Sequence, residues 1–168
     1  MISLDVSNSD IVKAKNQISE FEKIDAGSWR YTNVEAWRGV VCEFKTSEWL
    51  DQEFNLEIKA KGLDTSGIVD EFDVVVNNKK IEIKSATKNY FKYIMPKTHD
   101  VLSYPKDYLI ASKYDETTSP NKVKIIGFLN YSVLKDFPIK KNKGAPYFEI
   151  PIEAFIPIEK FKSEIYLT

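Results

Sequence analysis

One hairpin in the middle of the chain restricts the fold more than any other stretch. Residues 68–76 and 79–86 are rich in β-branched side chains, and Asn77 and Asn78 between them are typical of a two-residue hairpin turn. Such a turn predicts an antiparallel hairpin in a single register. The expected pairs are Val76 with Lys79, Val75 with Lys80 and Val74 with Ile81.

The charged residues of this hairpin fall on one face. Continuing the register places Asp73 opposite Glu82 and Glu71 opposite Lys84, and alternate residues of a strand point to the same side. Opposed residues hold their Cβ atoms about 4.5–5.5 Å apart, where two like charges are destabilising. Two opposed carboxylates with a lysine nearby therefore suggest a bound cation.

A solvated strand face gives the same pattern. Half-exposed antiparallel strands carry polar residues on their wet side, and 29% of this chain is charged. The turn length also matters, since a three-residue loop would set Asp73 opposite Ile83 and weaken the geometry. The pattern alone leaves a cation site and a solvated face both open.

The cysteine and histidine content limits the chemistry. Cys42 is the single cysteine and His99 the single histidine, which excludes an internal disulfide and argues against a Cys–His catalytic pair. No apolar run approaches the roughly 18 residues of a membrane span, and the N-terminus lacks the apolar region of a signal peptide. The sequence predicts a cytoplasmic protein with no membrane partner.

The charge of the chain is divided unevenly. Residues 1–78 carry 15 acidic and 8 basic side chains, whereas residues 79–168 carry 10 acidic and 16 basic ones. Such a division fits a polyanionic partner on one side of the molecule. Mixing in space of charges distant in sequence is an alternative that stays open.

Two amphipathic helices are expected before the hairpin. Apolar residues at helical spacing predict the first over residues 9–24, which opens with a polar cap at Ser9-Asp10. The second is predicted to begin at Thr32 or Asn33 and to end between residues 50 and 54.

A stripe on the second helix is formed by Glu35, Gly39 and Glu43, which recur every four residues. Glycine costs a helix about 1 kcal/mol relative to alanine, so Gly39 suggests the close approach of another backbone. A tolerated glycine without a role is the alternative.

The remaining elements complete the expected fold. The order of helices and strands predicts a single α/β domain over residues 1–168, with a mixed central β-sheet flanked by helices. We divide it into an N-terminal helix and linker (1–31), a core (33–130) and a C-terminal elaboration (131–168). Within these, we expect strands over 108–111 and 123–129, short helices over 98–104 and 131–136, an exposed basic loop over 137–146, and a tail that docks across the sheet.

The hairpin resembles the core of a known family. Asp73, followed after eight residues by Glu82-Ile83-Lys84, is similar to the motif of the PD-(D/E)XK nuclease superfamily, which includes many restriction endonucleases and junction resolvases. No proline precedes Asp73, which departs from the family pattern. Asp70 is a rival for the aspartate position, although strand parity favours Asp73.

The second predicted helix extends the resemblance. Residues 38–44 look like the first core helix of the same superfamily, where a glutamate often lies near the metal. That position falls on Glu43, with Glu35 as its rival on the same stripe. The resemblance spans roughly residues 33–130 and implies a restriction-endonuclease-like core.

The resemblance also implies a metal-dependent chemistry. Asp73 and Glu82 would hold Mg²⁺, with Mn²⁺ as an alternative, together with the main-chain carbonyl of Ile83. Mg²⁺ prefers one or two carboxylates plus water and substrate phosphate, which suits phosphodiester hydrolysis. Lys84 would position or deprotonate the attacking water and offset phosphate charge.

Nucleic-acid contacts are expected after the hairpin. Residues 79–97 contain six lysines and one acid, interleaved with aromatic residues, a pattern typical of nucleic-acid binding. We expect Lys88 and Lys92 to face phosphates, while part of the aromatic set packs in the core. A second lysine group that could clamp a duplex, or simply be solvated, consists of Lys140, Lys141 and Lys143.

The sequence therefore predicts a Mg²⁺-dependent endonuclease that hydrolyses DNA. We expect a homodimer if the enzyme cuts both strands of a duplex. Three alternatives remain. They are a non-catalytic nucleic-acid-binding or assembly protein of the same fold, a ribonuclease of the same fold, and an α/β interaction protein whose charged strand face is solvated.

Overall fold

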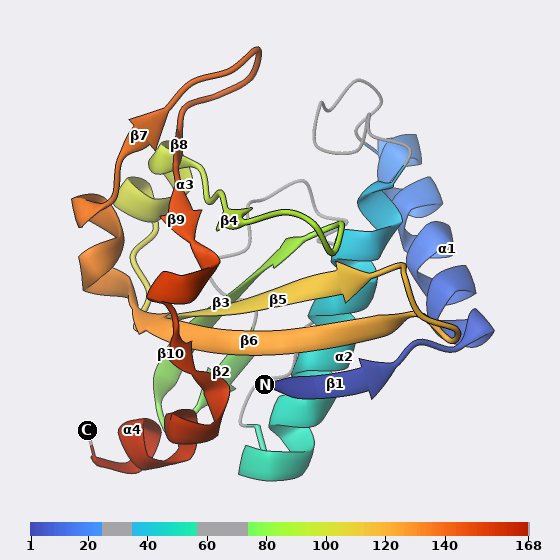
Figure 1. Ribbon diagram of the computed structural model, residues 1–168, viewed down its shortest axis with the longest axis horizontal. Helices are drawn as coiled ribbons and strands as arrows, with labels where there is room; N and C mark the ends of the chain where they lie inside the picture. The colour runs from blue at the N-terminus through green and yellow to red at the C-terminus, as the bar shows by residue number, and fades with distance from the viewer. Residues whose placement is uncertain (25–34, 57–73, 168) are drawn as a thin grey trace.

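A curled, six-stranded mixed β-sheet forms the centre of the molecule (Figure 1). The computed structural model describes residues 1–24, 35–56 and 74–167, without the side chains of residues 21–24. The strand order is β1-β6-β5-β3-β2, and β10 also pairs with β6. The predicted α/β fold, with a mixed sheet flanked by helices, is confirmed at this level.

The elements follow the chain in the order of their labels. The central sheet contains β1 (Ile2–Asp5), β2 (Val74–Val76), β3 (Lys79–Ala86), β5 (Tyr108–Asp115), β6 (Lys122–Asn130) and β10 (Ile156–Pro157). Two small ladders pair β4 (Tyr93–Ile94) with β9 (Ile150–Pro151), and β7 (Ile139–Lys140) with β8 (Tyr147–Phe148). The helices are α1 (Asn8–Ile24), α2 (Ala36–Phe54), α3 (Thr98–Ser103) and α4 (Phe161–Leu167), with the 3-10 helices η2 (Tyr131–Asp136), η3 (Ile152–Ala154) and η4 (Ile158–Lys160).

The β2–β3 hairpin has the predicted two-residue turn. Asn77 and Asn78 adopt φ angles of 48° and 59°, the left-handed conformation that a type I′ turn requires at both central positions. The pairs Val74–Ile81, Val75–Lys80 and Val76–Lys79 match the expected register. The predicted strand residues 68–73 lie outside the described part of the chain.

Strand β3 is an interior strand of the sheet. It pairs antiparallel with β2 on one side and parallel with β5 on the other, with Glu82 beside Leu109 and Lys84 beside Ala111. The long hairpin β5–β6 then continues the sheet in the antiparallel sense. The expected strands over 108–111 and 123–129 are both present and extend further than predicted.

The two faces of the sheet are covered by different elements (Figure 1). On one face, Ile81 and Ile83 pack with residues of α2, η4 and α4, and α1 lies against α2. On the other face, Leu109 and Ala111 pack with residues of β4, α3, η2, β8 and β9. Because side chains alternate along β3, Glu82 and Lys84 point to the second face.

Residues near both ends of the described chain form strands of the central sheet. The predicted division of the domain did not include these two strands. Residues Ile2–Asp5 form β1 on β6, although we assigned residues 1–31 to a helix and linker. Strand β10, within the predicted elaboration 131–168, pairs with β6 as well. Four-residue and two-residue strands carry too little alternation to be recognised from pattern alone.

The helix boundaries differ slightly from expectation. The predicted cap residue Asp10 does cap α1, but its partner is Ser7 rather than Ser9. The Ser7 hydroxyl accepts from the Asp10 amide at 3.2 Å, and the Asp10 carboxylate accepts from the Ser7 amide at 2.8 Å. Helix α2 begins at Ala36, and the predicted start at residues 32–33 lies outside the described residues. None of the helices in the described ranges has the length and apolar character needed to cross a bilayer.

Gly127 permits the pairing of β10 with β6. A Cβ atom at this position would lie 2.2 Å from the carbonyl oxygen of Ile156, closer than any real contact. At Gly144, by contrast, an added Cβ meets nothing within 4 Å.

We therefore predict that Gly127→Ala lowers the free energy of unfolding by about 3 kcal/mol, because the overlap is with backbone and β10 must move. Gly144→Ala serves as the matched control and should change stability by less than about 1 kcal/mol. Urea unfolding followed by circular dichroism measures both. Equal stability of the two variants would contradict a close β6–β10 contact at Gly127.

Candidate functional site

The candidate site is centred on Glu82, a carboxylate that β3 holds in the interior. Only 7% of the residue is exposed. Its Oε1 atom lies 2.7 Å from Lys84 Nζ, and its Oε2 atom lies 3.0 Å from Lys106 Nζ. Each carboxylate oxygen therefore contacts one ammonium group, and two positive charges surround one negative charge.

Burial and the two lysines act on the ionisation of Glu82 in opposite directions. Burial alone would raise the pKa of the carboxyl group, because it penalises the charged form. The nearby charges of Lys84 and Lys106 outweigh that penalty and hold the pKa of Glu82 below its ordinary value. Glu82 is thus an ionised carboxylate at neutral pH, stabilised by charge rather than by water.

Lys106 belongs to this cluster but was not among the site residues predicted from the sequence. It precedes β5, its side chain is 2% exposed, and its ammonium group lies 5.5 Å from the centre of the Tyr131 ring. A lysine before a buried strand is a common surface feature, so the sequence carries no signal for this role. Only the parallel pairing of β3 with β5 brings it to Glu82.

Asp73, the predicted partner of Glu82, lies outside the described residues, and so does its rival Asp70. The opposition of Asp73 and Glu82 therefore stays a prediction. Within the described ranges, no three His, Cys, Asp or Glu side chains gather in a way that could hold a metal ion. The described residues do provide one ionised, buried carboxylate, Glu82, which is a donor of the hard oxygen type that Mg²⁺ prefers.

The helix glutamates lie across the sheet from this cluster. Ser85 points toward α2, since its hydroxyl oxygen lies 3.6 Å from where a Cβ of Gly39 would be. That distance is an ordinary contact, so the expected close backbone approach at Gly39 is not observed. Glu43, one turn later and half-buried, lies on α2 and therefore on the face opposite Glu82. Glu35 forms ion pairs with Arg38 and Lys88, both at 3.5 Å.

The other predicted site residues have separate surroundings. The Ile83 side chain is buried in the core, and the metal-binding role of its carbonyl stays a prediction. Lys88 contacts Glu35, and its ammonium group lies 5.6 Å from the centre of the Tyr90 ring, whereas Lys92 is exposed. These positions do not test whether Lys88 or Lys92 contacts phosphate.

Cys42 is excluded as a reactive thiol. It is fully buried in α2, and burial raises the pKa of its thiol to about 12.

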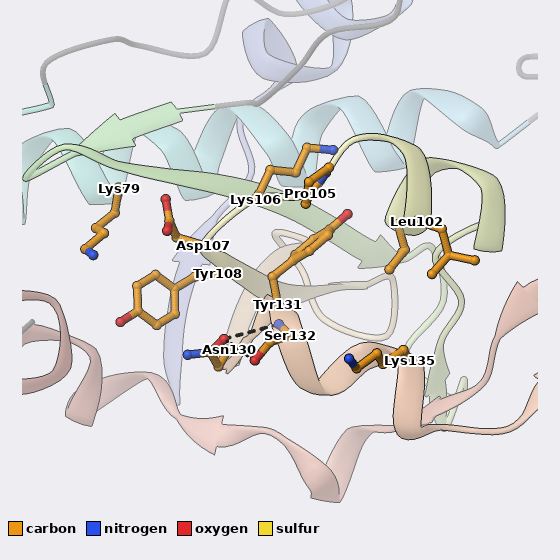
Figure 2. A pocket seen from close by; sticks show the side chains of 11 residues that line it. Lys79, Leu102, Pro105, Lys106, Asp107, Tyr108, Asn130, Tyr131, Ser132 and Lys135 are labelled. Carbon is orange, nitrogen blue, oxygen red and sulfur yellow. Dashed lines mark hydrogen bonds between the residues drawn. The ribbon is translucent and has the colours of Figure 1, made fainter.

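A cavity of about 480 Å³ lies beside Lys106 (Figure 2). Leu102, Pro105 and Tyr131 contribute apolar surface, and Lys79 and Lys135 lie on its other sides. Lys106 thus links two features, because it lines this cavity and also contacts Glu82.

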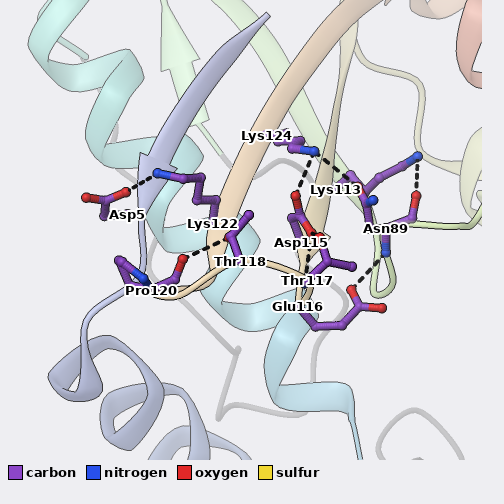
Figure 3. A network of polar contacts seen from close by, with 10 residues as sticks. All are labelled: Asp5, Asn89, Lys113, Asp115, Glu116, Thr117, Thr118, Pro120, Lys122 and Lys124. Carbon is purple, nitrogen blue, oxygen red and sulfur yellow. Dashed lines mark hydrogen bonds and ion pairs between the residues drawn. The ribbon is translucent and has the colours of Figure 1, made fainter.

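A polar network holds the turn that follows β3 (Figure 3). Asn89 donates from its amide to Glu116 at 2.9 Å, its carbonyl accepts from Lys113 at 2.9 Å, and its side chain accepts from Lys124 at 3.2 Å. Lys124 also lies 2.7 Å from a carboxylate oxygen of Asp115. The segment that carries Lys88 and Lys92 is therefore attached to the far end of the β5–β6 hairpin.

Asp115 is the buried anion of that network, with 2% of the residue exposed. Burial would raise its pKa, but hydrogen bonds from Lys124 and from the hydroxyl and amide of Thr117 outweigh this effect and lower it to about 2. Asp115 is consequently ionised at neutral pH.

The fold and site together define an α/β protein whose interior strand carries a buried glutamate between two lysines. No family model, no curated protein and no solved structure matches this chain.

We predict that Lys106→Met lowers the free energy of unfolding by about 2 kcal/mol, because it leaves a buried carboxylate with one ammonium group instead of two. The double variant Glu82→Gln/Lys106→Met should recover part of this loss. Lys135→Met, at an exposed lysine of the same cavity, is the control and should change stability by less than about 0.5 kcal/mol. Urea unfolding at pH 7 measures all three, and an unchanged Lys106→Met protein would contradict a stabilising role.

A second prediction concerns pH. Because the pKa of Asp115 is about 2 in the folded protein and about 4 in an unfolded chain, its contribution is fully present above pH 4 and is lost as the pH falls toward 2. Asp115→Asn should cost about 2 kcal/mol at pH 7 and should unfold with a weaker pH dependence between pH 4 and pH 2. Thermal unfolding across that range tests this, and parallel curves for the two proteins would contradict it.

Proposed function

We propose that the chain is a metal-dependent endonuclease with a restriction-endonuclease-like core of the PD-(D/E)XK type, which hydrolyses DNA phosphodiester bonds. The observation that supports it best is the buried, ionised Glu82 with Lys84 at 2.7 Å on an interior strand of a mixed sheet. Burying a carboxylate costs desolvation free energy unless cations lie beside it. A buried, ionised carboxylate is therefore suited to binding cations.

The residues have distinct roles in this proposal. Asp73, Glu82 and the carbonyl of Ile83 would hold Mg²⁺ or Mn²⁺, whereas Glu43 lies on the opposite face of the sheet and takes no part in this site. The bound metal would supply Lewis acidity, lowering the pKa of water and offsetting phosphate charge. Because both oxygens of Glu82 contact lysines in the described structure, metal binding would require one lysine to move away.

Lys84 is the proposed catalytic lysine. Its side chain is 37% exposed, compared with 2% for Lys106, so Lys84 is the lysine that could leave Glu82 and reach water and substrate. In the hydrolysis, a water oxygen bonds to phosphorus, the bond from phosphorus to the leaving oxygen breaks, and a proton reaches that oxygen. Lys84 would orient the attacking water as an ammonium group, or accept the proton of that water after first losing its own proton to solvent, and Lys106 would keep Glu82 ionised.

The test is a cleavage assay on plasmid DNA, single-stranded DNA and RNA, with Mg²⁺, Mn²⁺ or EDTA. We expect metal-dependent cleavage of DNA that Asp73→Ala and Lys84→Ala each reduce by about 100-fold or more. Glu53→Gln and Lys162→Ala, at exposed positions on α2 and α4, are the matched controls and should cleave normally.

The other outcomes separate the alternatives. Cleavage of RNA alone would make the protein a ribonuclease, and binding without cleavage would make it a nucleic-acid-binding or assembly protein. Cleavage that survives both site substitutions would show that the site lies elsewhere. Two copies are expected to act together on a duplex, which sedimentation of the DNA complex would reveal.

A further inference from the structure

Two stretches that lack acidic residues run side by side. No Asp or Glu occurs between Glu82 and Asp100, or between Asp136 and Glu149. The structure joins these stretches: the Phe148 amide donates to the Pro96 carbonyl at 2.9 Å, and the Thr98 amide donates to the Pro146 carbonyl at 3.1 Å. Neighbours separated by about fifty residues in sequence therefore share one surface.

Their lysines form what we call the basic surface. It consists of Lys88, Lys92, Lys97, Lys140, Lys141 and Lys143. Four of these, Lys92, Lys140, Lys141 and Lys143, are exposed and form no ion pair with any described residue. Asp100 and Glu149 are the acidic residues that border the paired segments. Lys92, Lys140, Lys141 and Lys143 thus give the basic surface a positive charge that no described residue neutralises through an ion pair.

Large apolar side chains are exposed among these lysines. Tyr90 is 66% exposed and Ile139 is 60% exposed, and Tyr93 and Met95 are also exposed. Exposed aromatic residues beside lysines suit a ligand that has both a charged backbone and flat apolar groups.

The basic surface lies on the same side of the sheet as the candidate site. Ile94 of β4 packs in the core cluster on the face to which Glu82 and Lys84 point, and β4 contacts β3. The β7–β8 hairpin extends beyond β4 and α3 at that side (Figure 1). A chain-like ligand could therefore follow the hairpin and β4 toward the site.

We propose that the β7–β8 hairpin is a nucleic-acid-binding arm, which with β4 holds the sugar-phosphate backbone of a strand that enters the candidate site. The identity of the ligand rests on the proposed function. The arm itself rests on the pairing of the two acid-free stretches and on charge complementarity. Each lysine that neutralises a phosphate releases counterions, so this binding should weaken as salt rises.

The test measures binding of fluorescent DNA strands, DNA duplexes and RNA to the full chain in EDTA at several salt concentrations. The arm variant is Lys140→Gln/Lys141→Gln, and the matched control is Lys160→Gln/Lys162→Gln, two exposed lysines near α4. We expect the arm variant to weaken binding about 10-fold and to reduce the slope of log K against log salt by about 1.5, with little change in the control.

The results separate this inference from the proposed function. Three outcomes would contradict the inferred arm. They are equal effects of the two variants, no nucleic-acid binding by the unaltered protein, and binding of polyglutamate as tight as that of nucleic acid. Arm-dependent binding without any metal-dependent cleavage would contradict the proposed nuclease function but would support the nucleic-acid-binding arm. Lys84→Ala should abolish cleavage while leaving arm-dependent binding in place.

Discussion

The left-handed backbone at Asn77 and Asn78 is the constraint on which the site depends. Two residues with positive φ make a two-residue turn, and that turn sets the parity of β3 relative to β2. With this parity, Ile81 and Ile83 enter the core under α2, while Glu82 and Lys84 point to the other face. A shift by a single residue would exchange the two sets, burying the charges where the isoleucines now pack.

The cluster around Glu82 shows how a buried charge is maintained. Desolvation of a carboxylate costs several kcal/mol, and direct contact with cations recovers that energy only at short distance. Lys84 provides one contact from within β3, and Lys106 provides the other from the segment before β5. The carboxylate thus depends on the parallel pairing of two strands far apart in sequence. Its geometry is a product of the tertiary fold rather than of the local Glu-x-Lys pattern.

Much of this structure was predictable where a local rule applies. The Asn-Asn turn gave the register of β2 and β3, and helical periodicity gave α1 and most of α2. Lys106 could not be predicted, because only tertiary structure brings it to Glu82. The strands β1 and β10 could not be predicted either, since each is too short to show a period. Asp73 remains a sequence-based prediction, because it lies outside the described residues.

Strand β6 receives both ends of the described chain along a single edge. β1 pairs with Lys122 to Ile125 and β10 with Gly127 and Phe128, so the two strands occupy consecutive parts of that edge. During synthesis, this part of β6 has no β10 partner until residues 156 and 157 have left the ribosome. An unpaired strand edge is a template for intermolecular pairing, so a C-terminally truncated chain should be prone to aggregation.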